Sequence, residues 1–336
     1  MNNDNNRVIL GLGLESSCDE TSAAVVKNGS RILSHEIYSQ IDLHGEYFGV
    51  VPEIASRAHL EVINGLIQKA LDDAGITFAD LDYVSATQRP GLVGSLLIAL
   101  QSAKAISFVK RIPFIPVNHL EAHLYAPFLE EKSPEYPFVG LLVSGGNTAV
   151  YIVRDIDDYE LIGKTVDDAV GEAYDKVSKF LELGYPGGPH IEKMARTATV
   201  KKQLFPKILA DTGKDDTRFS YSGIKTAVIN YIRENPQADR AEIVWSFQER
   251  ALEILARRVF TTARLHNISN IIVAGGVAAN GRLRELLHDK KKKTENIIIP
   301  SPLLCTDNGA MVAGIGYQYF TRGLQSHLNI DVSARA

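Results

Sequence analysis

The chain is poor in cysteine and carries no excess of positive charge. Its 336 residues include only two cysteines, Cys18 and Cys305, and the formal net charge is −4. Two isolated cysteines form no disulfide framework and no zinc-ligand spacing, so we expect reduced thiols and a cytoplasmic protein. An acidic chain has no overall positive field for nucleic acid, so any contact with RNA must use a local basic patch.

The sequence also lacks the features of secreted and membrane proteins. Its start, MNNDNNRVILGLGLE, has no basic segment followed by a long apolar run, so we expect no signal peptide. We find no apolar stretch that approaches the length of a membrane span. What is present is ordinary globular composition, with 45% hydrophobic and 23% charged residues. The length predicts two domains, each with its own core.

The common nucleotide-binding motifs are absent as well. The chain has no GxxxxGK[ST] motif and no GxGxxG before an expected helix. The GLG at 11–13 precedes a turn instead of a helix, so a Rossmann fold is disfavoured. Any nucleotide must therefore bind to other loops.

Two halves of the chain repeat one order of expected elements. Each reads as a hairpin with a polar turn, a third strand, a helix, a strand with a glycine loop, a helix, a strand and a helix. The charged, proline-bearing segment LEEKSPEYP at 129–137 suits a linker between them. Helices in the second half are expected over 168–183, 221–233 and 240–265. We predict an α/β protein of two mixed-sheet lobes, 1–129 and 130–336, that face a ligand cleft.

Small and acidic residues fill the polar turn of each half, ESSCDET at 15–21 and SGGNT at 144–148. Glycine lets backbone N–H groups approach a phosphate, and hydroxyls add donors. The alternative is two plain hairpin turns. The segments GGPHIEK at 187–193 and AGGVAANG at 274–281 add further candidates for nucleotide contact, among them Gly188, Glu192 and Asn280.

The segment VNHLEAHLYAP at 117–127 holds two histidines with a glutamate between them. At about 100° per residue, His119 and His123 share one face of a helix, whereas Glu121 projects from the opposite face. A zinc metalloprotease needs the glutamate directly after the first histidine, so that interpretation fails. The pair suits a metal, although a pair bonded to carbonyl groups is the alternative. Asp307, in CTDNGAM, is the candidate third ligand, and two imidazoles with one carboxylate are typical of iron(II) or zinc.

Nine ordered segments, from about Val8 to Tyr319, resemble the bacterial tRNA adenosine threonylcarbamoyltransferase (TsaD-like) family, formerly labelled O-sialoglycoprotein endopeptidase. They are GLESSCDETSAAV, GVVPEIASRAH, RPGLVGSLL, VNHLEAHLYAP, LLVSGGNT, DDAVGEAYDKVSKFLELGYPGGP, FSYSGIKTAV, AGGVAANGRLR and CTDNGAM. The resemblance implies two RNase-H-like lobes of the actin, sugar-kinase and heat-shock-ATPase type around a nucleotide cleft. The lobe 1–129 would hold the metal-ligand histidines, and the lobe 130–336 the nucleotide-binding loops and a helical insertion.

The resemblance also implies a reaction and a set of site residues. The family transfers threonylcarbamoyl from threonylcarbamoyl-AMP to the exocyclic amine of the tRNA adenosine 3′ of the anticodon, in tRNAs that decode ANN codons. One divalent metal, Fe²⁺ in first place and Zn²⁺ in second, would be held by His119, His123 and Asp307. The ATP or threonylcarbamoyl-AMP ligand would contact Leu142, Val143, Ser144, Gly145, Gly146, Asp175, Gly188, Glu192 and Asn280.

Three points stay open at the level of the sequence. Glu15 is a candidate catalytic base or water-orienting acid, but holding the hairpin turn is an equal alternative. Asn147 stands where many bacterial members have histidine, which leaves the fine contacts of that turn open. Lys290–Lys293, with a looser group at Lys201, Lys202 and Lys207, is either an RNA-binding patch or a solvated helix end.

Two other functions compete with the transferase. One is an ATP-dependent small-molecule kinase of the same fold class, which would hold Mg²⁺ mainly through oxygen ligands. The other is a regulatory ATP-binding subunit, which the full set of ligand residues disfavours. The resemblance implies tRNA as substrate and two helper proteins, a small homologous dimerising (TsaB-like) subunit and a P-loop ATPase (TsaE-like) subunit.

Overall fold

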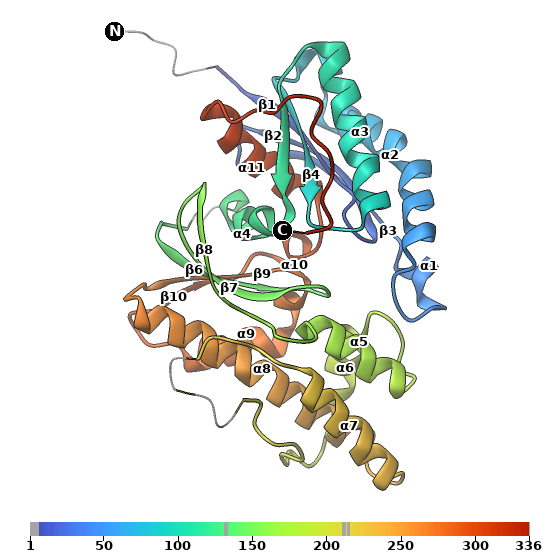
Figure 1. Cartoon of the computed structure of the whole chain (residues 1–336), viewed down its shortest axis with the longest axis vertical. Helices are drawn as coiled ribbons and strands as arrows, with labels where there is room; N and C mark the ends of the chain where they lie inside the picture. Colours follow the sequence, from blue (N-terminus) through green and yellow to red (C-terminus); the bar gives the residue numbers. More distant parts are fainter. Residues whose placement is uncertain (1–6, 131–133, 210–212, 214–215, 336) are drawn as a thin grey trace. The chain divides into compact units, whose positions relative to one another are not determined.

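A computed structural model describes residues 7–130, 134–209, 213 and 216–335 of the chain (Figure 1). The chain divides into two compact units. Unit 1 comprises Met1–Leu43, Val50–Ser133 and Thr306–Ala336, and unit 2 comprises His44–Gly49 and Pro134–Cys305. Each unit has its own five-stranded mixed sheet, so the predicted α/β class with two mixed-sheet lobes is confirmed.

Unit 1 is built on a sheet of order β3-β2-β1-β4-β5. The first three strands pair antiparallel, and β1, β4 and β5 run parallel. Its strands are β1 (Leu10–Glu15), β2 (Glu20–Lys27), β3 (Arg31–Ser39), β4 (Tyr83–Arg89) and β5 (Phe114–Asn118). Its helices are α2 (Pro52–Ala74), η1 (Phe78–Asp80), α3 (Val93–Lys110), α4 (His119–Tyr125), η2 (Ala126–Leu129) and α11 (Gly309–Thr321), and the short α1 (Ile41–Gly45) crosses the division between the units.

The two faces of strand β1 pack against different helices because successive side chains of a strand point to opposite faces. Leu12 and Leu14 are fully buried in a core that also contains apolar residues of α2 and α3. Gly13, on the other face, is approached by α11: a Cβ added there would lie 2.2 Å from the carbonyl oxygen of Gly309. Glycine therefore lets the start of α11 lie directly on the sheet.

Unit 2 repeats this sheet, with the order β10-β9-β6-β7-β8. Read from its hairpin outward, the order is that of unit 1, which confirms the repeat predicted from the sequence. Its strands are β6 (Phe138–Val143), β7 (Thr148–Asp155), β8 (Asp158–Lys164), β9 (Asn270–Ala274) and β10 (Asn296–Ile298). Its helices are α5 (Val170–Phe180), α6 (Gly187–Ala195), α7 (Ser222–Glu234), α8 (Arg240–Leu265), η3 (Gly276–Ala279), α9 (Gly281–Lys290) and α10 (Pro302–Cys305).

The end of the chain differs from the predicted division into 1–129 and 130–336. Thr306–Ala336 belongs to unit 1 instead of to the second lobe. The reason is the close packing of α11 on β1, β2 and β4, which joins this segment to the first sheet. Part of the expected linker, 131–133, lies outside the described residues.

Helix α3 corrects a second expectation. We expected no apolar stretch of membrane-spanning length, but α3 is long and apolar enough to cross a membrane by length and composition alone. It packs against α2 and β4 in unit 1, and Leu96, Ala99, Leu100 and Ala103 are fully buried there. These contacts are those of a core helix.

Candidate metal centre and glycine-rich loops

The predicted metal ligands lie in or just before two helices, α4 and α11. Helix α4 begins directly after β5, and the side chain of Asn118 accepts a hydrogen bond from the Leu120 N–H, which satisfies a free donor of the first turn. Asp307 stands two residues before α11, where Asn308 accepts in the same way from the Met311 N–H. Both caps fix the backbone next to a proposed ligand.

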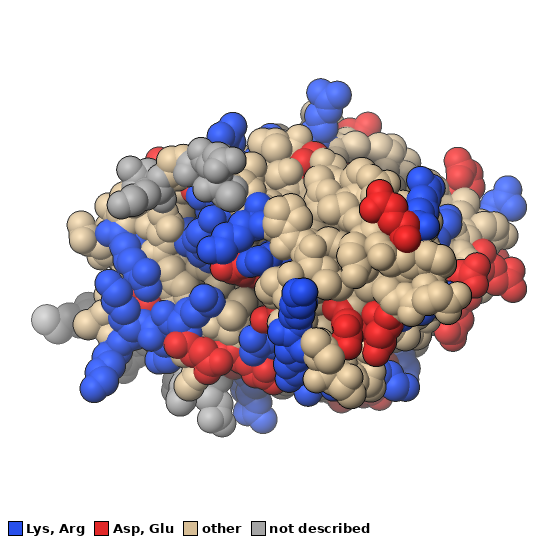
Figure 2. All heavy atoms as spheres, turned by 90° about the horizontal axis from the view of Figure 1, so that it is seen from below, with Lys and Arg blue, Asp and Glu red and all other residues tan. Residues whose placement is uncertain are grey.

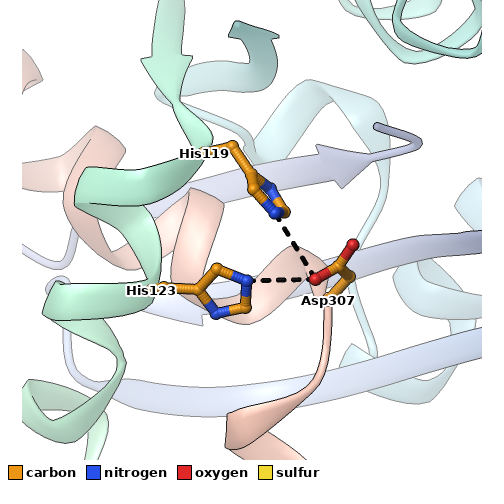
Figure 3. A group of neighbouring side chains, drawn as sticks. All are labelled: His119, His123 and Asp307. Atoms are coloured by element: carbon orange, nitrogen blue, oxygen red, sulfur yellow. Dashed lines mark hydrogen bonds and ion pairs between the residues drawn. The ribbon is translucent and has the colours of Figure 1, made fainter. Parts of the chain in front are cut away.

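The structure brings His119, His123 and Asp307 together (Figure 3). The Oδ1 atom of Asp307 lies 3.0 Å from Nε2 of His123 and 3.4 Å from Nε2 of His119. The three ligand atoms lie within 4.8 Å of one another, and both histidines are buried. All three residues belong to unit 1, although Asp307 follows the whole of unit 2 in the chain.

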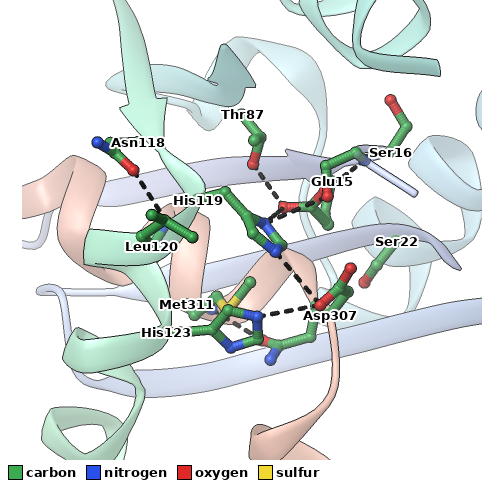
Figure 4. A network of polar contacts seen from close by, with 12 residues as sticks. Glu15, Ser16, Ser22, Thr87, Asn118, His119, Leu120, His123, Asp307 and Met311 are labelled. Atoms are coloured by element: carbon green, nitrogen blue, oxygen red, sulfur yellow. Dashed lines mark hydrogen bonds and ion pairs between the residues drawn. The ribbon is translucent and has the colours of Figure 1, made fainter. Parts of the chain in front are cut away.

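Glu15, at the end of β1, supports the cluster from behind (Figure 4). Its side chain is fully buried, and Oε2 lies 3.0 Å from Nδ1 of His119. The Thr87 hydroxyl donates to the same oxygen at 2.5 Å, and the Ser17 N–H donates to Oε1 at 2.5 Å. Both carboxylate oxygens are thus occupied, one of them by a proposed metal ligand.

The charges in this site shift the pKa values of its members. Burial by itself would lower the pKa of His119, but the negative charges of Asp307 and Glu15 raise that pKa well above the usual range. Burial lowers the pKa of His123. Burial would raise the pKa of Glu15 and of Asp307, but the neighbouring His119 lowers both. The site therefore stabilises positive charge between two carboxylates.

The donor set fits a divalent metal. When Nδ1–H of His119 donates to Glu15, the lone pair of Nε2 is left to face the cluster, an arrangement common behind metal-bound histidines. Nδ1 of His123 is buried and has no hydrogen-bond partner among the described residues. Two imidazole nitrogens and one carboxylate oxygen suit zinc or iron(II) with open positions.

Glu121 has a different environment from the two histidines beside it in sequence. Its carboxylate accepts a hydrogen bond from the Tyr319 hydroxyl of α11, and burial raises its pKa. The structure thus gives it a packing role between α4 and α11, in agreement with the helical geometry that excluded a protease site.

Sequence reasoning missed Thr87 and Ser17 as parts of the site. The Ser17 hydroxyl lies 3.3 Å from Nδ1 of His119, and Thr87 bonds Glu15. A signal for Thr87 existed: it lies near the carboxyl end of β4, which runs parallel to β1. Polar residues at the carboxyl ends of adjacent parallel strands meet at one edge of a sheet.

The predicted glycine turn of unit 2 connects β6 and β7. The Ser144 N–H donates to the Asn147 carbonyl at 2.8 Å, and the Asn147 N–H donates to the Ser144 hydroxyl at 3.0 Å. A Cβ added at Gly145 or Gly146 would meet no atom within 4 Å, so one side of this turn is open. Asn147, the departure from the family pattern, closes the turn through its backbone.

A second group of predicted residues forms two hydrogen-bonded pairs in unit 2. Asp175 of α5 accepts from the Gly187 N–H at 2.7 Å, next to Gly188. Glu192 of α6 accepts from the Gly281 N–H at 3.1 Å, next to Asn280, which caps α9. The loop that contains Asn280 follows β9, and β9 runs parallel to β6. These loops and the Ser144 turn therefore belong to the same edge of the sheet, where α/β proteins bind ligands.

Two other predicted contact residues lie inside the sheet. The side chains of Leu142 and Val143 in β6 are fully buried. Gly275 packs against the end of this strand, because a Cβ added there would lie 2.4 Å from the Val143 carbonyl oxygen. The side chains of these two residues are therefore not available to a ligand.

The repeated five-strand order places the chain in the actin-like class of two-lobed α/β proteins, and solved structures share the fold. Component A of (R)-2-hydroxyglutaryl-CoA dehydratase from Acidaminococcus fermentans matches with a TM-score of 0.56 at 16% identity, over 94% of this chain and 100% of that chain. HypF from T. kodakarensis matches with a TM-score of 0.62 at 14% identity, over 94% of this chain and 47% of that chain.

Sequence comparison then specifies the family. Residues 31–314 match the family described as TsaD: tRNA N6-adenosine threonylcarbamoyltransferase. A tRNA N6-adenosine threonylcarbamoyltransferase from Clostridium perfringens (strain SM101) is 46% identical over 332 residues, which is 97% of both chains. The chain belongs to this family of tRNA-modifying transferases, which confirms the resemblance seen in the sequence.

Proposed function

We propose that this chain transfers threonylcarbamoyl from threonylcarbamoyl-AMP to the exocyclic amine of the adenosine 3′ of the anticodon, in tRNAs that decode ANN codons. Family membership carries the transferase activity and the tRNA substrate. One observation supports the more specific reaction: the chain combines a buried His–His–Asp cluster with open glycine loops at strand ends. A nucleotide-activated acyl donor needs both a phosphate-binding loop and a cationic centre.

The reaction is an acyl transfer that needs no external oxidant or reductant. The adenine amine attacks the carbamoyl carbon, and a new C–N bond forms. The bond from that carbon to the phosphate oxygen breaks, AMP leaves with the electron pair, and the amine gives up a proton. Because the amine is a poor nucleophile, holding it against the donor supplies a large share of the acceleration.

The loops of unit 2 are our candidates for donor binding. The N–H groups of Gly145 and Gly146, beside Ser144, would contact the phosphate, together with the backbone of Leu142 and Val143. Asp175 and Glu192 would accept hydrogen bonds from the ribose. Gly188 and Asn280 would flank the base. Asp175 and Glu192 already accept from the backbone N–H groups of Gly187 and Gly281, which holds both carboxylates in place.

His119, His123 and Asp307 are our candidates for holding one divalent metal, Fe²⁺ in first place and Zn²⁺ in second. When bound, such an ion would supply Lewis-acid stabilisation of negative charge on the donor. The residues around it have separate tasks. The Glu15 carboxylate holds the His119 ring in one orientation, and Thr87 and Ser17 hold Glu15.

This geometry favours a positioning role for Glu15 over the role of catalytic base. Both of its oxygens accept hydrogen bonds, and its side chain is fully buried. A base must reach the proton that it removes. We therefore propose that Glu15 acts through His119.

Helper proteins and location complete the proposal. We propose that the chain works in the cytoplasm with a small homologous dimerising (TsaB-like) subunit and a P-loop ATPase (TsaE-like) subunit. The two alternative functions are disfavoured. A kinase would hold Mg²⁺ through oxygen ligands and phosphates, whereas two of the three clustered donors are imidazole nitrogens.

The decisive experiment supplies purified, iron-loaded protein with threonylcarbamoyl-AMP and an unmodified tRNA, with and without the helper subunits. We expect the modified adenosine, detected by mass spectrometry of nucleosides, and release of AMP. No product under any condition would overturn the proposal, and ATP-dependent phosphorylation of a small molecule would favour a kinase. In the same assay, a Glu15→Gln variant with weakened metal binding but wild-type transfer at saturating metal would support the positioning role.

A further inference from the structure

Positive charge is concentrated in three stretches of unit 2. These stretches, residues 196–209, 250–264 and 282–295, together contain 14 Lys and Arg but only four Asp and Glu. The whole chain contains 36 Lys and Arg and 40 Asp and Glu. The rest of the chain is therefore strongly acidic. The sequence shows this bias but does not show whether the three stretches meet.

Helix α8 provides one face on which they do meet. Ser246, Arg250, Arg257 and Arg264 fall within about 40° of one another around the helix axis, at about 100° per residue. They extend over about 27 Å at about 1.5 Å per residue. Segments that contact these four side chains therefore lie along one face of α8.

Both of the other stretches contact this face of α8. The Leu204 N–H donates to the Ser246 hydroxyl at 2.7 Å, and Arg257 donates to the Ile208 carbonyl at 2.7 Å, so the segment 204–208 runs along the helix. At the far end, Arg264 bonds Glu295, at the turn after Lys290–Lys293.

We call six exposed lysines beside this face the α8 strip: Lys201, Lys202, Lys207, Lys290, Lys292 and Lys293. Among the described residues, none of the six forms an ion pair with a carboxylate. Most acidic side chains nearby form ion pairs with arginines. The pairs are Arg250 with Glu253, Arg264 with Glu295 and Arg282 with Glu285. Figure 2 shows Lys and Arg gathered on the left of the face seen from below, together with some acidic side chains.

We propose that the α8 strip binds the phosphate backbone of tRNA, as a surface that holds the substrate without reading its sequence. This inference rests on the proposed function, which supplies the tRNA. Flexible exposed lysines suit phosphates, which carry charge but no sequence information. An acidic protein is a weaker candidate, because lysine is depleted at protein–protein interfaces.

The experiment compares two triple variants and their combination with a matched control. The first triple variant carries Lys290→Gln, Lys292→Gln and Lys293→Gln. The second carries Lys201→Gln, Lys202→Gln and Lys207→Gln. The control removes three surface cations of unit 1 through Lys27→Gln, Arg31→Gln and Lys110→Gln. Each protein is tested for tRNA binding at several salt concentrations and for steady-state transfer with its helper subunits, and thermal melting checks the fold.

We expect the six-lysine variant to raise Kd and KM for tRNA about tenfold or more near 0.1 M salt, with kcat unchanged at saturating tRNA. The slope of log affinity against log salt should fall by about 0.7 to 0.9 for each phosphate that the variant no longer neutralises. Each triple variant should show part of this effect, and the control should stay within about twofold of the wild type.

Unchanged tRNA affinity and an unchanged salt slope in a folded six-lysine variant would overturn the inference. Loss of helper-subunit binding with normal tRNA binding would overturn it too, and would make the α8 strip a protein interface. A wild-type protein that binds tRNA through the strip but transfers nothing would leave this inference standing and remove the proposed function instead.

Discussion

Units 1 and 2 share a sheet order but carry different chemistry at the corresponding hairpin turns. In unit 1, Glu15 at the end of β1 and Ser17 in the turn that follows both contact the ring of His119. In unit 2 the turn after β6 contains Gly145 and Gly146, which leave backbone N–H groups beside open space. The residues at the first turn are buried and include a carboxylate, whereas those at the second turn are glycines beside open space.

This difference teaches that the repeat specifies where a site lies and not what it binds. The strand order brings loops to the same sheet edge in both units. The residue types then decide the ligand: carboxylate and imidazole favour a cation, and glycine favours a phosphate. The comparison predicts that each site can be damaged without damage to the other.

The largest expected effect is on the metal centre. Loss of a residue that only supports a metal ligand costs up to about 100-fold in metal affinity or activity. Because Asp307 is itself a proposed ligand, we expect Asp307→Asn to abolish metal binding and to lower transfer by more than about 100-fold. The neutral amide removes the negative charge that both histidines share, 3.0 Å from Nε2 of His123 and 3.4 Å from Nε2 of His119. Metal analysis and calorimetry with nucleotide measure the two sites separately.

Glu121→Gln is the matched control for that variant, because Glu121 lies between the same two histidines in sequence yet bonds Tyr319. It should keep its metal and lose about 1 kcal/mol of stability or less. A metal-free but nucleotide-binding Asp307→Asn protein would support separate sites. Full metal occupancy in that variant would remove Asp307 from the ligand set.

A smaller effect is expected from the glycine turn of unit 2. A Cβ added at Gly171 would lie 2.7 Å from the Ser144 carbonyl oxygen and 2.8 Å from Gly145 Cα, so Gly171→Ala should displace the turn. We expect a loss of about 1–3 kcal/mol of stability and weaker nucleotide binding, with metal content unchanged.

Gly223→Ala controls for the backbone effect of the Gly171 substitution, since a Cβ added at Gly223 meets no atom within 4 Å. Calorimetric titration with ATP and metal analysis of both variants provide the test. Loss of metal from Gly171→Ala would contradict the independence of the two units.

The smallest expected effect is a pH dependence confined to unit 1. Burial lowers the pKa of His35 in β3 to about 4, from 6.5. Above pH 6.5 the ring is neutral in both states and costs nothing. As the pH falls from 6.5 to about 4, the unfolded chain binds a proton that the folded chain does not, so stability falls.

His35→Leu should remove this dependence, worth about 2 kcal/mol at about pH 5. The strand at the same sheet position in unit 2, β8, has no histidine (DYELIGK). Hydrogen exchange resolved by peptide should therefore show the difference between wild type and variant in unit 1 and not in β8. Equal acid profiles for the two proteins would show that the burial of His35 has no energetic consequence.

The sequence predicts the elements well where local signals agree. The helix expected over 240–265 has those bounds in the structure, because apolar periodicity and the cap at Asp239 coincide. Helix α2 ends where a glycine follows in the sequence, and this Gly75 has the left-handed backbone (φ 67°) of a helix C-cap. The repeat was also visible, because hydrophobic patterning sets the order of strands and helices.

The arrangement in space was predicted less fully. The chemistry of two imidazoles suggested Asp307, and the structure brings the three side chains together. For Thr87 the only signal was its position near the carboxyl end of a strand, since a threonine in a strand is by itself ordinary β-sheet composition. The return of Thr306–Ala336 to unit 1 was missed because the apolar pattern of α11 shows that it is buried, but not which sheet it covers.

This return has a consequence for how the protein is made. Asp307 lies 184 residues after His123 in the chain, so the ribosome completes the whole of unit 2 before the third donor exists. Domains generally fold as units during synthesis, the N-terminal one first. Here the first unit is completed only by residues 306–321, so until they are made His119 and His123 lack the carboxylate of Asp307. A complete set of donors therefore exists only in a chain that extends past unit 2, and a chain truncated before Asp307 would carry unit 2 but no complete metal site.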